Sequence, residues 1–126
     1  MENYTLVLTE HLNHNGKLFG GQLLKWVDEF AWIAAISDYR HSILVTRAME
    51  KIEFKKTVVP GSVLRFSIRR SHTGTTSVTY AVEVYAREPD HDGEELIFSN
   101  LVTFCAVDAE GKKTPLPAPE GKPAVC

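Results

Sequence analysis

Asp28 stands seven residues after the glycine pair Gly20-Gly21, and groups of these types at this spacing could activate water against a carbonyl group. The stretch 22–37 reads QLLKWVDEFAWIAAIS, which predicts a largely apolar helix with the acid in its middle. A carboxylate is costly to bury among apolar neighbours without a purpose. Glycines at a helix start let a ligand reach backbone N–H groups at the positive end of the dipole, where a developing oxyanion is stabilised. A carboxylate further along the helix could hold or deprotonate the attacking water.

Gly21 and Asp28 point to the same side of the predicted helix but lie two turns apart. The two residues are therefore separated by about 10 Å along the helix axis. One water cannot bridge that gap, so either the ligand lies along the helix or the two groups come from different copies of the chain. We favour a dimer. A structural role for Asp28, paired with Lys25 or Arg47 at the edge of the apolar face, stays open.

Other polar residues have both a structural and a functional interpretation. Asn15 beside Gly16 predicts a turn, whereas Asn13 is less needed by a turn and its amide could donate to a carbonyl or orient water. Thr46 lies on a predicted strand and is most simply a strand residue. A third group combines cations, hydroxyls and a glycine, which suit phosphate, although a plain hairpin explains part of it equally well: Arg69, Arg70, His72, Gly74, Thr75, Thr76 and Ser77.

The rest of the chain has the alternation of β-strands, so the predicted fold class is α+β. Strands are expected over residues 4–8, 43–54, 62–70, 77–87 and 96–107, mostly antiparallel because hairpin turns join them. A helix that is apolar nearly all round needs cover on more than one side, which predicts a sheet wrapped around one central helix, with the help of a second subunit. We expect one domain over 1–116 and a proline-rich tail over 117–126, with everything from Asp108 onward forming a mobile strap.

Composition and cysteine usage indicate which partners and which cellular compartment suit the chain. The chain has 126 residues, 44% of them hydrophobic and 24% charged, and its formal net charge of −2 favours neither nucleic acid nor an anionic membrane as a partner. Cys105 and Cys126 lack the spacing of a zinc site or a disulfide framework, which favours a reducing, cytoplasmic setting. The N-terminus does not read as a signal peptide, and the longest apolar run is too charged for a membrane span.

These residues together resemble the hotdog-fold acyl-coenzyme A (acyl-CoA) thioesterases of the acyl-CoA hydrolase branch. The resemblance covers roughly residues 4–116 and rests on the order and spacing of several segments: Asn13-His14-Asn15-Gly16-Lys17-Leu18-Phe19-Gly20-Gly21 with Asp28, Val45-Thr46, Gly61, Gly74-Thr75-Thr76-Ser77, and Val107-Asp108 to Gly111. It implies a hotdog fold and hydrolysis of an acyl-CoA thioester to a free acid and CoA. CoA is then part of the substrate, and no separate cofactor or metal is expected.

The resemblance also implies roles for single residues. Asp28 matches the catalytic acid, Asn13 the asparagine that positions water or the carbonyl, and Gly21 the amide that acts as oxyanion donor. Thr46 matches a polar residue on the far side of the site, and the loop 74–77 lies near CoA. Such sites form across a dimer, with Asn13 and Asp28 from different subunits, and the dimers often join into hexamers.

The chain departs from the family pattern at two places, Thr57, where a proline is common, and the lead-in Glu10-His11-Leu12. We expect Asp28 to act as a general base, while its direct attack to give an anhydride stays open. A hydratase or dehydratase would want a histidine beside the acid, and His11 and His14 lie on the loop instead. A non-catalytic acyl-CoA binding or sensing module is the alternative from another class, although it would be expected to lose the acid.

Overall fold

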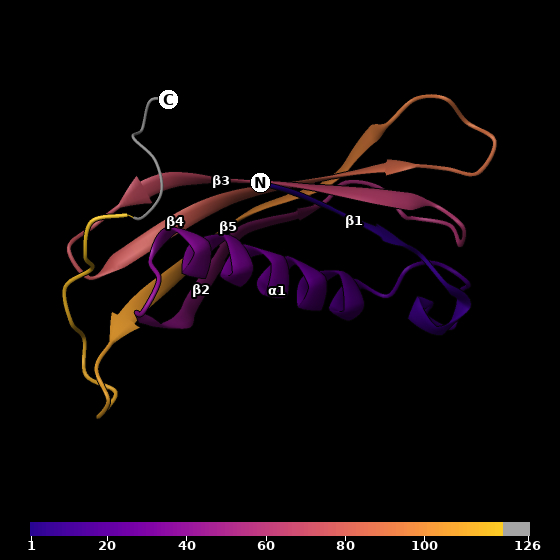
Figure 1. Cartoon of the computed structure of the whole chain (residues 1–126). Coiled ribbons are helices and arrows are strands. Elements are labelled where there is room, and N and C mark those ends of the chain that lie inside the picture. The colour runs from indigo at the N-terminus through magenta and orange to yellow at the C-terminus, as the bar shows by residue number, and fades with distance from the viewer. Residues whose placement is uncertain (120–126) are drawn as a thin grey trace.

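Five antiparallel strands form one sheet that arches over a long helix (Figure 1). The structure is a computed structural model that describes residues 1–119. In chain order the elements are β1 (Glu2–Leu6), the 3-10 helix η1 (Thr9–His11), α1 (Gly20–Asp38), β2 (Ile43–Phe54), β3 (Val63–Thr73), β4 (Ser77–Arg87) and β5 (Glu95–Val107). The strand order is β1-β3-β4-β5-β2, so β1 and β2 are the edges. The predicted α+β architecture and all five strands are confirmed.

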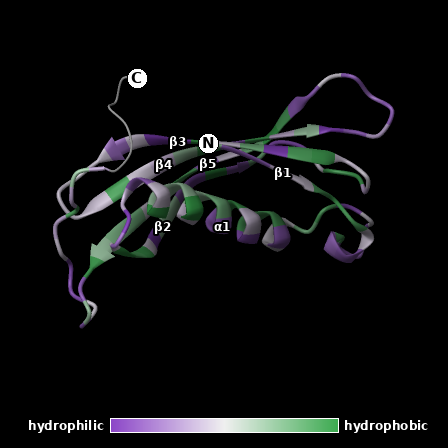
Figure 2. Cartoon of the chain, in the orientation of Figure 1, coloured by the Kyte–Doolittle hydropathy of each residue, from purple (hydrophilic) through white to green (hydrophobic). Residues whose placement is uncertain are grey.

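The helix begins two residues before the predicted start, because Gly20-Gly21 forms its first turn rather than the preceding loop. Phe19 is the N-cap in extended conformation, and the chain leaves the helix at Tyr39, whose N–H donates to the Ala35 carbonyl at 2.9 Å. One side of α1 packs on the sheet through the buried residues Leu23, Trp26, Val27, Ala31, Ala34 and Ala35. Figure 2 shows hydrophobic residues on the strands and along the side of α1 that faces them.

No residue among 1–119 covers the opposite side of α1. Trp32 and Ile33 expose 41% and 39% of their surface, and Trp32 Nε1 donates to the Leu44 carbonyl of the edge strand β2 at 3.3 Å. The sequence predicted cover on more than one side, and the sheet of one chain provides only one. An apolar strip next to an unpaired strand edge is the surface that another chain would cover.

The C-terminal end of α1 is fastened to β3 and β4 by a polar cluster. Asp38 is unfavourable at the negative end of the helix dipole, and two groups offset it. The hydroxyl of Tyr80 donates to Asp38 Oδ2 at 2.6 Å, and Arg70 Nη1 lies 3.2 Å from the same oxygen. Burial, and then the hydrogen bond to Asp38, raise the pKa of Tyr80 well above its ordinary value.

The Tyr80→Phe substitution should lower the free energy of unfolding at pH 7 by about 1 kcal/mol, because it removes one hydrogen bond. The native protein keeps the Tyr80 proton above the ordinary tyrosine pKa of 10.0, whereas the unfolded chain releases it. Stability of the wild type therefore falls as the pH rises above about 10. Urea unfolding at pH 7 and pH 11 should show a smaller alkaline loss in the variant, and an equal loss in both proteins would contradict this assignment.

The segment after β5 is not the mobile strap that was predicted. Asp108 Oδ1 accepts hydrogen bonds from the N–H groups of Glu110 and Lys112, and Gly111 supplies the positive φ of 85° that this turn requires. The chain then returns along the sheet, where Leu116 N–H donates to the Thr75 carbonyl at 2.9 Å. Residues 108–116 are thus tied to the body by backbone hydrogen bonds.

The predicted tail covers residues 117–126. Its last seven residues, 120–126, which include Cys126, lie outside the described residues. Cys105 is a buried free thiol. None of the helices in the described part of the chain has the length and hydropathy needed to cross a membrane. Within residues 1–119, no group of three or more potential metal ligands comes together.

Candidate active site

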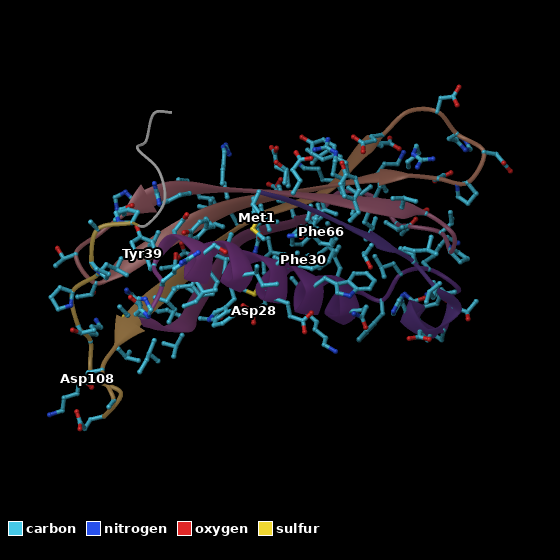
Figure 3. All side chains as sticks on the ribbon, viewed as in Figure 1. Met1, Asp28, Phe30, Tyr39, Phe66 and Asp108 are labelled. Atoms are coloured by element: carbon cyan, nitrogen blue, oxygen red, sulfur yellow. The ribbon has the colours of Figure 1, made fainter. Side chains whose placement is uncertain are left out.

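Asp28 lies in the middle of α1, where a threonine on β2 holds it. Thr46 Oγ1 donates to Asp28 Oδ1 at 2.8 Å. The half-buried carboxylate is on the side of α1 that faces away from β3 and β4, whereas Phe30 and Phe66 meet between helix and sheet with ring centroids 4.9 Å apart (Figure 3). Sequence reasoning missed the contact between Asp28 and Thr46, because it is set by the crossing of helix and strand.

The carboxylate opens onto a hollow of about 430 Å³ on the uncovered side of the chain. Asp28 and Thr46 line this hollow together with Glu29, Phe30, Trp32 and Ile33. The predicted structural alternative, an ion pair of Asp28 with Lys25 or Arg47, does not form within the described residues. A neutral hydroxyl that fixes one oxygen leaves the other free to accept a proton from a ligand or from water.

The first turn of α1 presents open N–H donors. Gln22 and Leu23 donate to the Phe19 carbonyl, whereas the N–H groups of Gly20 and Gly21 have no acceptor within residues 1–119. The ring of Phe19 lies on Gly21, where an added Cβ would come within 2.6 Å of it, so a larger residue at position 21 would force this ring to move. These two amides at the positive end of the dipole could bind an oxyanion.

Asn13 organises the loop before α1. Its Oδ1 accepts hydrogen bonds from the N–H groups of Asn15 and Lys17, at 2.9 and 3.2 Å, and Gly16 supplies a positive φ of 75°. The expectation that a turn has less need of Asn13 is therefore wrong, since its oxygen builds the turn. Its side-chain NH₂ makes no hydrogen bond within the described chain and stays available as a donor.

His11 is occupied elsewhere. Its ring packs edge-on against Trp26 with centroids 4.7 Å apart, and its Nδ1 accepts the Leu8 N–H at 3.0 Å. Hydratase chemistry would need a histidine next to Asp28. Among residues 1–119, no histidine forms a hydrogen bond or ion pair with Asp28.

The predicted phosphate-binding residues lie at the β3–β4 hairpin, near the C-terminal end of α1 and far from Gly21 (Figure 1). Part of the group is structural: Arg70 pairs with Asp38, Gly74 N–H closes the hairpin on the Ser77 carbonyl, and Thr76 accepts a backbone hydrogen bond from β5. Arg69, His72 and Thr75 are exposed.

Within one chain, the predicted site residues therefore fall into three places along α1. Asn13 and Gly21 lie at its N-terminal end, Asp28 and Thr46 at its middle, and the hairpin at its C-terminal end. One chain does not bring these three places together.

Comparison with known proteins identifies the family. The model of the Thioesterase superfamily matches residues 15–91. The chain belongs to this superfamily. The acyl-CoA thioester hydrolase YciA of Escherichia coli (strain K12), a relative of this thioesterase-superfamily chain, is 34% identical over 120 residues, which cover 90% of this chain and 87% of the relative. Acyl-coenzyme A thioesterase 11 of Mus musculus is 31% identical over 119 residues, and the match covers 93% of this chain but only 20% of the mouse protein's length.

Solved structures of thioesterases share the same hotdog fold. An apo-hexameric acyl-CoA thioesterase is 31% identical with a TM-score of 0.86, covering 98% of this chain and 79% of that one. An acyl-CoA hydrolase from Staphylococcus aureus in complex with butyryl-CoA and CoA is 27% identical with a TM-score of 0.84, covering 94% and 71%. That hydrolase has also been solved with an asparagine and, separately, an aspartate 15 positions later replaced by alanine.

Proposed function

We propose that the protein is an acyl-CoA thioesterase that hydrolyses an acyl-CoA to a carboxylic acid and CoA. The observation that carries this proposal is the Asp28 carboxylate, held by Thr46 and open to a hollow on the uncovered side of the chain. Asn13 and Asp28 are 15 positions apart, the same separation as the asparagine and aspartate replaced in the S. aureus hydrolase. The names of the E. coli relative and of the solved structures support the same substrate class.

The active site that we infer is shared by two copies of the chain. The edge strand β2, with the exposed Trp32 and Ile33 of α1 next to it, is the surface best suited to another copy. A two-fold axis between two β2 strands makes them pair antiparallel, so the two α1 helices also run in opposite directions. The N-terminal end of one helix then faces the middle of the other. This pairing unites the separated half-sites, and three such dimers would form the hexamer that the solved thioesterase adopts.

The reaction that we derive needs only side chains, backbone and water. The thioester carbonyl oxygen accepts hydrogen bonds from the Gly21 N–H and the Asn13 NH₂ of one subunit. Asp28 of the other subunit takes a proton from water as the water oxygen bonds to the carbonyl carbon. When the tetrahedral intermediate collapses, the C–S bond breaks and the CoA sulfur leaves as a thiolate. The proton held by Asp28 then passes to that sulfur, which regenerates the carboxylate.

The β3–β4 hairpin is the part of the chain that we assign to the phosphates of CoA. The exposed Arg69 and His72 and the hydroxyl of Thr75 supply charge and donors there. In the antiparallel dimer, this hairpin approaches the N-terminal end of the partner helix. CoA is part of the substrate, so the proposed reaction uses no separate cofactor. The buried free thiol of Cys105 fits a reducing, cytoplasmic setting.

Release of free thiol from a panel of acyl-CoAs tests this function. A thioesterase liberates one CoA thiol for each ester bond hydrolysed. Binding of the panel without thiol release would instead identify a binding module, and addition of water to an enoyl-CoA would identify a hydratase. Single turnover in heavy-oxygen water separates the two roles of Asp28, because label in the Asp28 carboxylate would overturn the general-base mechanism in favour of an anhydride.

The Thr46→Val substitution should lower kcat about five- to tenfold, because the loss of one hydrogen bond frees the Asp28 carboxylate to rotate. The Thr46→Ser variant keeps the hydroxyl and serves as the matched control, with near-normal kcat. Steady-state thiol release measures both variants. Equal rates in the valine and serine variants would remove Thr46 as a positioning residue.

A further inference from the structure

A buried asparagine on β5 has no partner for its side chain. Asn100 is 4% exposed, and within residues 1–119 neither its Oδ1 nor its Nδ2 makes a hydrogen bond. An amide offers one acceptor oxygen and two donor hydrogens, and a buried amide without partners costs several kilocalories per mole in lost hydration. Such a group in a native protein calls for an explanation.

Asn100 faces α1 rather than solvent. Along β5 it alternates in phase with the buried Phe98, Val102 and Phe104. Its partner across the ladder is Val82 on β4, in phase with Tyr80, whose hydroxyl reaches the last residue of α1. The amide therefore interrupts an apolar row directly under the helix, and no charged residue occupies that row of β4 and β5.

The strand next to Asn100 is irregular at this level. The ladder between β2 and β5 pairs Glu50 with Leu101 and then Glu53 with Ser99, so two residues of β2 stand opposite Asn100 alone. One of them, Lys51, has a φ of 54°, in the left-handed region that costs a lysine about 1–2 kcal/mol. Bulges are over-represented both at sheet edges, where β2 lies, and next to active sites.

The pairing of β2 with β5 places Asn100 between Gly20 and Asp28 of the same chain, and in the proposed dimer these two residues contribute to different sites. Phe98 pairs across the ladder with Phe54 on β2, and the ring of Phe54 lies 3.5 Å from the position that a Cβ on Gly20 would occupy. Phe104 pairs across the same ladder with Thr46, whose hydroxyl donates a hydrogen bond to Asp28. Asn100 follows Phe98 by about 7 Å and precedes Phe104 by about 13 Å. It lies under the part of α1 between Gly21 and Asp28, and therefore between the two sites to which this chain contributes.

We propose that Asn100 recognises a hydroxyl group on the acyl chain, so that the preferred substrates are hydroxyacyl-CoAs. This inference rests on the proposed thioesterase function and names its substrate class. A hydroxyl uses both ends of the amide, since it donates to Oδ1 and accepts from Nδ2. A carboxylate would be buried there without a countercharge, and a plain alkyl chain would leave the amide unpaired. The half-buried, unbranched Met49, paired with Val102 one step along the ladder, is a side chain that can yield space to the chain.

The test compares matched esters, namely butyryl-CoA with 3-hydroxybutyryl-CoA, and hexanoyl-CoA with its 3- and 5-hydroxy derivatives. In the wild type, kcat/KM for the best hydroxyacyl ester should exceed that of the unsubstituted ester by about 10- to 100-fold. Asn100→Leu, which has nearly the same shape, should reverse the preference, and Asn100→Ala should abolish it. Ser62→Ala is the matched control, because the Ser62 hydroxyl is also buried without a partner but lies at the turn before β3.

A preference that is the same in the wild type and in Asn100→Leu would overturn this inference, and a bound water or a partner subunit would then be what satisfies the amide. Calorimetry with the Asp28→Asn variant measures the same preference as binding, without turnover. Preferential binding of hydroxyacyl esters without any hydrolysis by the wild type would overturn the proposed function alone. Hydrolysis with equal affinities for both kinds of ester would overturn the recognition by Asn100 alone.

Discussion

The Asp28→Asn variant should lose about three orders of magnitude in kcat and keep its fold. General-base assistance contributes roughly 10²- to 10⁴-fold to such reactions, and an amide cannot accept the proton of the attacking water. The fold is expected to survive because the carboxylate is half-buried and its described hydrogen bond comes from a neutral hydroxyl, which the amide oxygen can still accept. Thiol release measures kcat, and urea unfolding measures stability.

Glu29→Gln is the matched control for this substitution. Glu29 is the next residue along α1, lines the same hollow and is exposed, so the same loss of charge occurs beside the site. We expect near-normal kcat in that variant. Near-normal kcat in Asp28→Asn as well would remove Asp28 from the mechanism.

Local sequence patterns predicted the helix and the strands, whereas contacts between residues far apart in the sequence determined where the helix begins and how the C-terminal segment is held. All five strands lie within a few residues of their predicted bounds. Alternation predicted β3 and β4, because one face of a strand that packs on a core must be apolar, whereas strand-forming residues predicted β1. The glycine pair was predicted as loop on its composition, yet Gly20 and Gly21 form the first turn of α1, and the Gln22 and Leu23 N–H groups donate to the Phe19 carbonyl there. The stretch from Asp108 to the C-terminus looked mobile because of its several prolines, most of them after residue 116, whereas the backbone of 108–116 is held by hydrogen bonds to residues 75 and 106.

The candidate site shows the same division. Helical spacing predicted that Gly21 and Asp28 share a side and cannot serve one carbonyl from one copy, which the uncovered side of α1 supports. The spacing could not reveal that Thr46 binds Asp28, or that the oxygen of Asn13 is spent on its own turn. A visible signal for Asn100 was overlooked: it is a polar residue in phase with the apolar Phe98, Val102 and Phe104 of the same strand.

Two inactive variants of this protein should restore activity to each other when they share a dimer. The hydrogen bonds of Asn13 and the proposed role of Asp28 indicate which substitutions to combine. Asn13→Asp keeps the oxygen that accepts the N–H groups of Asn15 and Lys17, so the turn survives, and it removes only the NH₂ donor. Asp28→Asn removes the base. Each variant alone should have very low turnover, because every site in its homodimer carries one defect.

In a mixed dimer, one site collects both substitutions and the other site has neither, provided that Asn13 and Asp28 of each site come from different subunits. Random reassociation of equal amounts makes half of the dimers mixed, so about a quarter of the wild-type turnover should return. The control is Asp28→Asn mixed with the double variant, in which every site lacks the base and nothing should return. If each site lay within one chain, mixing would restore no activity in either experiment, because every chain would keep its own defect whichever partner it meets. Recovery in the first mixture alone would therefore place Asn13 and Asp28 on opposite sides of a subunit interface.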